Sequence, residues 1–341
     1  MNNINLLGID LAKDVFQLHG VDEKGNAVLK QRLTRKALIE YIANLQTCTI
    51  AMEACGGSNY WARKFESFGH TIKLISPQFV KPFVKGNKTD RNDAEAICEA
   101  ASRPSMRFVS TKTIEHQDMQ ALHRIRSRLV QERTAIANQI RGLLMEYGLI
   151  IPQGIYNIKK RLPGILEDGE NELSIIGRNF LLDLLTQLDE RTVKVDEYEE
   201  LIKNIFKRSE ECKKVEKLEG IGLLTATALI SSIGDVKTFK NGRHLAAFLG
   251  LVPKQHSSGN KQQMQGISKR GNVYLRSLLI HGARAAVRAA VNGKKEDAKS
   301  KWIIGLVDRC GKNKAAVALA NKTVRTAWAL LANDTEYKKV A

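Results

Sequence analysis

The chain has 341 residues, enough for about two or three domains with a substantial core. Its hydrophobic content of 43% and charged content of 26% are typical of a soluble globular protein, and no stretch approaches the ~20 apolar residues of a membrane span. Five cysteines without a C-x-x-C pair argue against a disulfide framework and a zinc ribbon, and the start does not resemble a secretion signal. We therefore expect a cytoplasmic protein.

The charge is strongly positive and unevenly spread. The formal net charge is +18, which predicts a polyanionic partner, nucleic acid before membrane. Residues 236–295 contain twelve Lys or Arg and no Asp or Glu. A solvated face usually mixes both signs, so this segment indicates a nucleic-acid-binding surface.

Residues 1 to about 110 alternate strand and helix signals. The first three strands are predicted to form an antiparallel meander with a turn at Asp22–Asn26, and Thr34 is expected to cap the first helix. The strands are predicted at 4–10, 15–20, 27–33, 48–53 and 71–76, with helices over 37–45 and 60–68. The order β-β-β-α-β-α-β-α is that of an RNase H-like α/β fold, in which the central strand carries the first acid.

Four carboxylates stand at the ends of these elements. Asp10 closes the first predicted strand, Glu53 closes the fourth, and Asp90 and Asp93 lie three apart at the start of a further helix. Oxygen ligands in this arrangement suit hard divalent cations, and two Mg²⁺ ions can activate both the attacking and the leaving oxygen of a phosphodiester. Acids at strand ends and helix N-termini are also common for structural reasons. For all four together in a basic chain, we favour the metal site.

From Ile114 to about Gly148 the pattern is wholly helical, and a second such stretch covers Leu181 to Ile205. A loop containing Pro152, Pro163 and Gly164 is expected between them. Each helix is about 45 Å long at 1.5 Å per residue, so a long helical hairpin or coiled coil is predicted. Its apolar stripes either pack only against each other or also form a dimer seam.

The region after Leu218 begins with a predicted helix-hairpin-helix element. Gly220 and Gly222 form a Gly-Ile-Gly turn that lets backbone N–H groups approach a phosphate at the next helix. A lone G-x-G is weak on its own, since many helix pairs turn on glycine. Its place just before the acid-free segment strengthens the nucleic-acid interpretation.

Inside the acid-free segment, a Ser-Gly pair follows a run of basic and polar residues in a glycine-punctuated loop. One interpretation is a phosphate-binding turn. The other is that Ser258 attacks a DNA phosphate, with His256 either as its base or as a phosphate contact. Four cations are candidates for holding the phosphate and stabilising the transition state: Lys254, Lys261, Lys269 and Arg270.

Several motifs together resemble a known family. The segments are 8–13, 52–54, 88–94, the Gly-Ile-Gly turn, Leu-Gly-Leu-Val-Pro at 249–253, Ser-Ser-Gly at 257–259, 266–272 and 318–322. Over essentially the whole chain they resemble the DEDD-type transposases of bacterial insertion sequences. That family combines a RuvC-like nuclease domain with a C-terminal serine domain and is guided by a bridge RNA.

The resemblance implies residue roles and partners. The family's metal-binding acids fall on Asp10, Glu53, Asp90 and Asp93, and its nucleophilic serine falls on Ser258, with Ser257 as the alternative. Implied partners are Mg²⁺, the DNA of element ends and target, a guide RNA, and further copies of the chain in a dimer or tetramer in the bacterial nucleoid.

The predicted domains are a RuvC-like nuclease domain at 1–112, a helical hairpin at 113–212, and a mainly α serine domain at 213–341. Two rival functions remain open. One is a Holliday-junction-type endonuclease in which Ser258 only holds phosphate, and the other is an architectural DNA-binding protein whose acids are structural.

Overall fold

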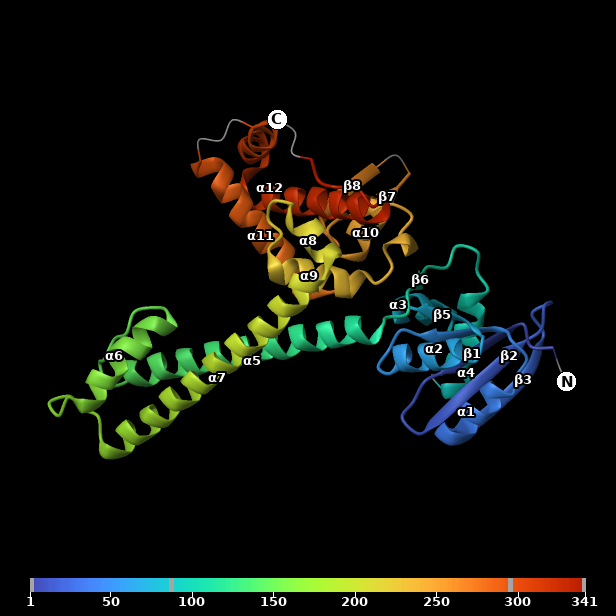
Figure 1. Cartoon of the computed structure of the whole chain (residues 1–341), viewed down its shortest axis with the longest axis horizontal. Coiled ribbons are helices and arrows are strands. Elements are labelled where there is room, and N and C mark those ends of the chain that lie inside the picture. Colours follow the sequence, from blue (N-terminus) through green and yellow to red (C-terminus); the bar gives the residue numbers. More distant parts are fainter. Residues whose placement is uncertain (1–2, 86–88, 260, 294–296, 339–341) are drawn as a thin grey trace. The chain divides into compact units, whose positions relative to one another are not determined.

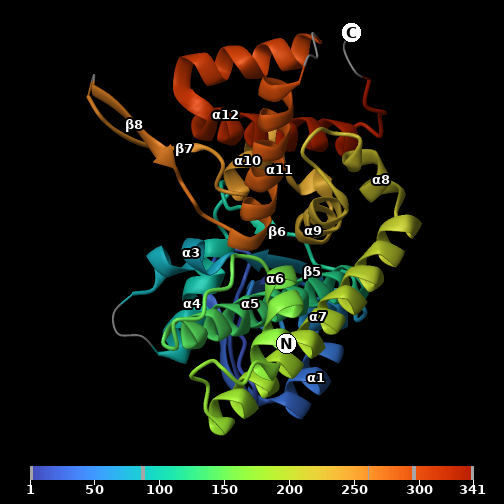
Figure 2. The same ribbon diagram turned by 90° about the vertical axis from the view of Figure 1, so that its left-hand side faces the viewer.

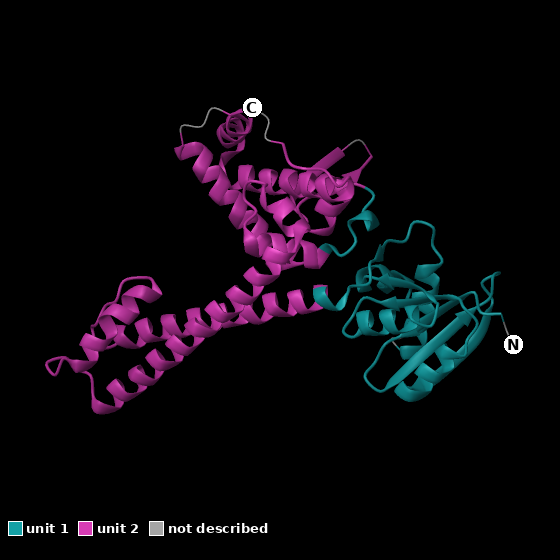
Figure 3. Cartoon of the chain, viewed as in Figure 1, with its two compact units in different colours: residues 1–115, 233–240 teal, residues 116–232, 241–341 magenta. Residues whose placement is uncertain are grey.

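The computed structural model describes residues 3–85, 89–259, 261–293 and 297–338. The chain separates into two compact units, one of residues 1–115 with 233–240 and the other of residues 116–232 with 241–341 (Figure 3). The predicted division at 112 and 212 stays a prediction. In the described residues, none of the helices combines the length and apolar character needed to cross a membrane.

The first unit is built on a six-stranded mixed sheet with strand order β3-β2-β1-β4-β5-β6 (Figure 1). Its strands are β1 (Leu6–Asp10), β2 (Val15–Val21), β3 (Ala27–Thr34), β4 (Thr49–Glu53), β5 (Thr71–Ile75) and β6 (Phe108–Val109). Strands β1, β2 and β3 form the predicted antiparallel meander, whereas β1, β4 and β5 are parallel. The predicted order of strands and helices is confirmed, and β1 lies inside the sheet, as expected for the strand that carries Asp10.

Alternation along β1 divides its side chains between two cores. Leu7 and Ile9 are fully buried in the core that includes α1 and α2. Leu6 faces the opposite core, which is filled by apolar residues of α4. The helices of this unit are α1 (Arg35–Ala43), α2 (Ser58–Glu66), α3 (Pro77–Val80), the 3₁₀ turn η1 (Lys81–Phe83) and α4 (Asp90–Ala101). The predicted Thr34 cap is confirmed, because its hydroxyl accepts a hydrogen bond from the Ala37 N–H at 3.5 Å.

The second unit contains the predicted helical hairpin, formed by α5 (Ile114–Met145) and α7 (Ile175–Arg208). Two ion pairs fix its antiparallel direction, since Arg126 reaches Glu199 whereas Glu132, further along α5, reaches Arg191, earlier on α7. At 1.5 Å per residue the helices are about 50 Å long. The long antiparallel pair was predictable because both helices carry an unbroken apolar stripe.

The expectation of a loop between these two helices is wrong in part. Residues Ile155–Glu167 form the helix α6, which contains Pro163 and Gly164 (Figure 1). Ile158 and Leu162 lie one turn apart and are fully buried against the hairpin core. This burial outweighs the backbone hydrogen bond that proline removes from the helix interior.

The rest of the second unit is mainly helical, with one β-hairpin. Its helices are α8 (Glu210–Glu216), α9 (Leu223–Ile233), α10 (Gly242–Phe248), α11 (Val273–Asn292) and α12 (Ala298–Ala332), and the 3₁₀ turn η2 (Val236–Thr238) belongs to the first unit. Helix α12 changes direction at Gly311, whose φ is 80°. Strands β7 (Pro253–Ser258) and β8 (Lys261–Ile267) pair as a separate antiparallel hairpin that projects from the helices of its own unit (Figure 2).

Candidate active site

Asp10 and Glu53 are neighbours at the carboxyl ends of two adjacent parallel strands. The register pairs Ile9 with Met52, so the next residue of each strand is an acid. Both carboxylates are half-buried, whereas Ile9 and Met52 are fully buried on the other face. Because side chains alternate along a strand, Asp10 and Glu53 share the face that α4 covers.

Gly8 allows α4 to lie directly on β1. A methyl group at Gly8 would stand 2.5 Å from the Ala94 carbonyl oxygen and 3.0 Å from the Cys98 N. The Cys98 thiol in turn lies 3.8 Å from the Leu6 carbonyl oxygen and 3.0 Å from that of His19. Helix α4 therefore runs antiparallel to β1, and its first turn lies toward the end of β1 that carries Asp10.

The first turn of α4 carries the other two predicted acids. Thr89 caps the helix by accepting from the Asn92 N–H at 3.3 Å, so Asp90 and Asp93 occupy the N-terminal turn. Asp93 is half-buried and Asp90 is exposed. The register thus brings Asp10 and Glu53 together, and the helix turn that carries Asp90 and Asp93 lies toward the same end of β1. In the described part of the chain, no three or more acid, histidine or cysteine side chains are close enough to form a complete metal site by themselves.

The thiol of Cys55, just after β4, responds to the two strand-end acids. Partial desolvation raises its pKa, and the negative charges of Glu53 and Asp10 raise it further. The charges of Glu53 and Asp10 therefore both reach the Cys55 thiol, just beyond the end of β4. A cation bound between neighbouring carboxylates offsets the repulsion between their like charges. The oxygen donor set fits a hard divalent ion.

Ser258 is the last residue of β7, so the expectation of an irregular loop here is wrong. Both strands of the hairpin are almost entirely polar, and Gly259 takes a positive φ of 55° directly after Ser258, as a tight hairpin turn favours. Every residue of β7 is exposed, including both serines. The hydroxyl of Ser258 is therefore presented to solvent at the tip of a projecting hairpin.

The pleat of the hairpin separates the two adjacent serines. Ser258 pairs with Lys261 across the hairpin, and His256 pairs with Gln263 on the same face. Ser257 lies on the opposite face, where its hydroxyl accepts a hydrogen bond from the Gln255 side chain at 2.8 Å. Only Ser258 shares its face with both a histidine and a lysine. This difference could not be seen in the Ser-Ser-Gly sequence itself.

At the base of the hairpin, residues 248–250 pack closely against residues 269–271. Gly250 has a φ of 70°, and a methyl group there would lie 2.3 Å from the Arg270 carbonyl oxygen. Gly271 has a φ of 75° and would meet the Phe248 carbonyl oxygen at 2.2 Å. The buried Arg276 donates from its guanidinium to the Arg270 carbonyl at 2.7 Å. The glycines of both motifs therefore permit close backbone contact below the serine.

The four predicted phosphate-binding cations all belong to this region. Lys254 lies on β7 and Lys261 on β8, while Lys269 and Arg270 lie in the segment that returns to the helices. All four side chains are exposed. Of these cations, Lys261 lies opposite Ser258 at the tip, whereas Lys254 lies near the base and Lys269 and Arg270 follow the base of the hairpin.

The Gly-Ile-Gly turn joins α8 to α9, but its two glycines differ. Gly220 has a φ of 85° and packs on α11, where a methyl group on Gly282 would lie 1.8 Å from the Gly220 carbonyl oxygen. Gly222 is exposed, with open space where a side chain would extend. Helix packing explains Gly220. Phosphate binding at the turn stays a prediction, and Gly222 is the glycine with room for it.

Two supporting residues were missed from the sequence. Gly8 belongs to the 8–13 motif, and Arg276 is one of the twelve cations of the acid-free segment. Arg276 lies among apolar residues of α11, one turn after the Asn272 cap, and this pattern was the available signal for a buried role. Asn321, in the terminal motif, donates to the Leu251 carbonyl at 3.1 Å and ties α12 to the same base.

Comparison with known proteins shows the class of enzyme. Relatives aligned over almost the whole chain are named transposases, enzymes that cleave and join DNA. One is the transposase for insertion sequence element IS1111A of Coxiella burnetii, 50% identical over 99% of this chain and 92% of that protein. Another is a probable family 20 transposase of Pseudomonas aeruginosa, 47% identical over 98% of this chain and 99% of that protein.

The particular family follows from two matches and these relatives. Residues 7–149 match the DEDD-type transposase model of IS110, and residues 212–299 match the transposase family IS116/IS110/IS902. The chain belongs to the IS110 family of insertion-sequence transposases. A more distant relative, the pilin gene-inverting protein of Moraxella bovis, is 22% identical over 98% of this chain and 97% of that protein.

Proposed function

We propose that this transposase excises and inserts an insertion sequence by a reaction that uses both a carboxylate metal site and Ser258. The observation that carries the proposal is the position of the four acids. Two end adjacent strands, and two begin the helix that lies against one of those strands. We further propose that the first unit is an RNase H-like, RuvC-like nuclease, since its meander and parallel strands follow that order.

Asp10, Glu53, Asp90 and Asp93 would hold Mg²⁺. When bound, Mg²⁺ would supply a Lewis acid for the phosphodiester at this edge of the sheet. The contribution of the fold is to hold these carboxylates in place. The two strand-end carboxylates are fixed by the parallel register, and Asp93 is held by the capped first turn of α4. DEDD-type family membership implies divalent metal use.

Ser258 would act as the nucleophile. Its oxygen forms a bond to phosphorus, the bond from phosphorus to one sugar oxygen breaks, and that oxygen leaves as a sugar hydroxyl after taking up a proton. The serine proton passes to a base, and His256 on the same face is a candidate for that role. Lys261, paired across the hairpin, would stabilise the charge that develops on the phosphoryl oxygens.

The partners proposed are the DNA of the element ends and target, a bridge RNA as guide, and further copies of the chain. The net charge of +18 and the acid-free segment support binding to polyanionic partners. In the oligomer, a dimer or tetramer, the acids of one copy would act with the serine of another. The nucleoid is the proposed location.

The rival endonuclease uses the same acids with water as the nucleophile, and Ser258 then only binds phosphate. The relatives named transposases argue against the purely architectural alternative. Replacement of each aspartate by asparagine and of Glu53 by glutamine tests the metal site and keeps nearly the same shape. We expect Asp93→Asn to remove most strand cleavage while DNA binding stays within about twofold of the unaltered chain.

The matched control is Asp183→Asn, an exposed acid on α7 far along the sequence from the site. It makes the same change in charge and is expected to leave cleavage intact. Full cleavage by the Asp93→Asn protein would remove that residue from the proposed site. Equal loss in both variants would show that the effect is one of net charge.

A further inference from the structure

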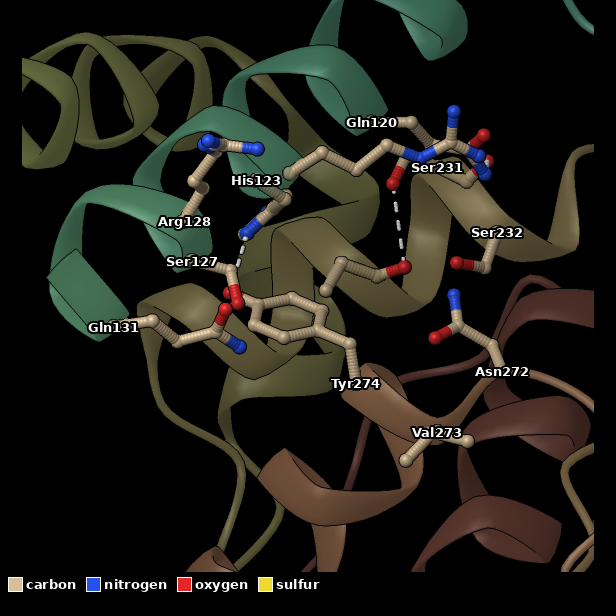
Figure 4. A pocket seen from close by; sticks show the side chains of 12 residues that line it. Gln120, His123, Ser127, Arg128, Gln131, Ser231, Ser232, Asn272, Val273 and Tyr274 are labelled. Carbon is tan, nitrogen blue, oxygen red and sulfur yellow. Dashed lines mark hydrogen bonds between the residues drawn. The ribbon is translucent and has the colours of Figure 1, made fainter.

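A polar cavity of about 670 Å³ lies within the second unit (Figure 4). Its walls come from α5, the end of α9 and the start of α11. Twelve residues line it, and they include two arginines but no aspartate or glutamate. The volume lies in the range of about 300–1,000 Å³ typical of small-ligand sites. Its lining therefore selects for an anionic, hydrogen-bonding ligand.

The two arginines are not equivalent. Arg128 is paired with Glu132 on the next turn of α5, at 2.8 Å, and Glu132 also pairs with Arg191. Arg124 is exposed at the cavity, and none of the ion pairs between described residues involves it. Arg124 is thus the cation that remains available for an anion, and a guanidinium presents the planar fork that binds phosphate well.

Polar uncharged side chains in the lining supply hydrogen-bonding groups beside the arginine. The Asn272 side-chain oxygen caps α11 by accepting from the Leu275 N–H at 3.1 Å, which leaves its NH₂ group as a donor. The Gln120 NH₂ group donates to the Ser231 carbonyl at 2.8 Å, which holds this side chain against the end of α9. Ser232 lies on the same side of the cavity as Asn272 (Figure 4). Donors and acceptors at fixed positions match the edge of a nucleobase.

The floor of the cavity is held by a directed chain of hydrogen bonds. Thr227 donates to the Leu223 carbonyl at 2.8 Å, so it accepts from His123 Nε2–H at 3.0 Å. His123 Nδ1 is then the acceptor and receives the Tyr274 O–H at 3.0 Å (Figure 4). Burial, together with the nearby charge of Arg126, lowers the pKa of His123 to about 4, which keeps the ring neutral. The Tyr274 ring is therefore fixed in place.

We propose that the cavity binds one nucleotide of a nucleic-acid strand, with Arg124 at its phosphate and the side chains of Asn272 and Ser232 at its base edge. Continuity supports a strand over a free ligand, because Asn272 and Tyr274 directly follow Lys269, Arg270 and Gly271 at the base of the Ser258 hairpin. A strand that lies along those exposed cations can extend one nucleotide into the cavity. The inference rests on the proposed function for the presence of such a strand.

Equilibrium binding of the full chain tests the phosphate contact. The probes are fluorescent single-stranded DNA and RNA oligonucleotides of identical sequence, measured by anisotropy across a salt series in EDTA. We expect Arg124→Gln to weaken binding about tenfold. It should also make the slope of log K against log salt less negative by about 0.7, the value for one contact on a single strand. The oligonucleotide with the larger change identifies the sugar of the bound strand.

Arg161→Gln is the matched control, since Arg161 is also an exposed arginine of the second unit but lies on α6. It should leave the slope unchanged. An equal change in both variants, or an unchanged slope in Arg124→Gln, would overturn the proposal. Thermal unfolding of each variant shows whether it is folded. If the unaltered chain binds neither oligonucleotide, the proposed function is contradicted. If it binds normally and Arg124→Gln changes neither affinity nor slope, only the cavity assignment is contradicted.

Photocrosslinking tests the base in the cavity independently of Arg124. An oligonucleotide that carries 5-iodouracil should crosslink to the peptide containing Tyr274. Ser232→Leu adds volume at the cavity wall without a change in charge and should reduce this crosslink at least fivefold while the Arg124-dependent salt slope persists. Crosslinking that is unaffected by Ser232→Leu would place the base elsewhere. Adenosine monophosphate that binds as tightly as the oligonucleotide would show a free-nucleotide site and overturn the strand assignment.

Discussion

The contact between Gly8 and α4 gives a sharp test of how the acids are positioned. A methyl group at residue 8 would lie 2.5 Å from the Ala94 carbonyl oxygen, and ordinary contact starts at 3.4 Å, so the two elements must separate by about 0.9 Å (3.4 − 2.5). Overpacking of this kind costs about 1–3 kcal/mol. Helix α4 begins with Asp90 and contains Asp93, so both acids move with it.

We therefore expect Gly8→Ala to lower the melting temperature by roughly 2–8 °C for each kcal/mol of stability lost. Cleavage should fall about 100-fold, since misplacement of reacting groups by about 1 Å has effects of that size. Thermal unfolding and strand cleavage are measured on the same preparation at a temperature where the variant is folded. Gly142→Ala is the control, because nothing lies within 4 Å of the added methyl group on α5. Wild-type cleavage by a destabilised Gly8→Ala protein would refute the proposed link between α4 packing and the acids.

Two further outcomes test other parts of the account. The pKa of His123 is lowered from 6.5 to about 4 in the folded chain, so between these pH values the unfolded chain binds a proton that the folded chain does not. The free energy of unfolding should therefore fall by up to about 3 kcal/mol as the pH decreases from about 7 to 4. Urea unfolding of His123→Gln should show a weaker pH dependence, and an identical profile would contradict the hydrogen-bond chain. Mixing Asp10→Asn with Ser258→Ala protein should restore a fraction of cleavage if subunits share a site, whereas no recovery despite proven co-assembly would favour a site within one chain.

The elements of the first unit were predictable because their signals are local. Alternating apolar residues, the Thr34 cap and the Asp22–Asn26 turn each act over a few residues, and the structure has the strands within a few positions of the prediction. The sequence indicated only that Asp10 and Glu53 end two strands; the parallel pairing of Ile9 with Met52 is what makes these two acids neighbours at one edge of the sheet.

The features that the sequence could not reveal depend on contacts between distant segments. Helix α6 exists because Ile158 and Leu162 are buried against α5 and α7, which outweighs the local signal of Pro163. The close approach of Gly220 and Gly282 joins positions 62 residues apart (282 − 220), so the turn glycine alone indicated only flexibility. The distinction between Ser257 and Ser258 needed the pairing of β7 with β8.

Mapping of a covalent protein–DNA adduct tests the central claim most directly. The full chain is incubated with its DNA and Mg²⁺, denatured rapidly and digested, and the peptide that retains a nucleotide is sequenced by mass spectrometry. We expect the nucleotide on Ser258, its complete loss in Ser258→Ala, and its persistence in Ser257→Ala, because only Ser258 shares a face with His256 and Lys261. An adduct on Ser257 or Ser268 would contradict the assignment, and active cleavage with no adduct in any variant would show that water is the nucleophile.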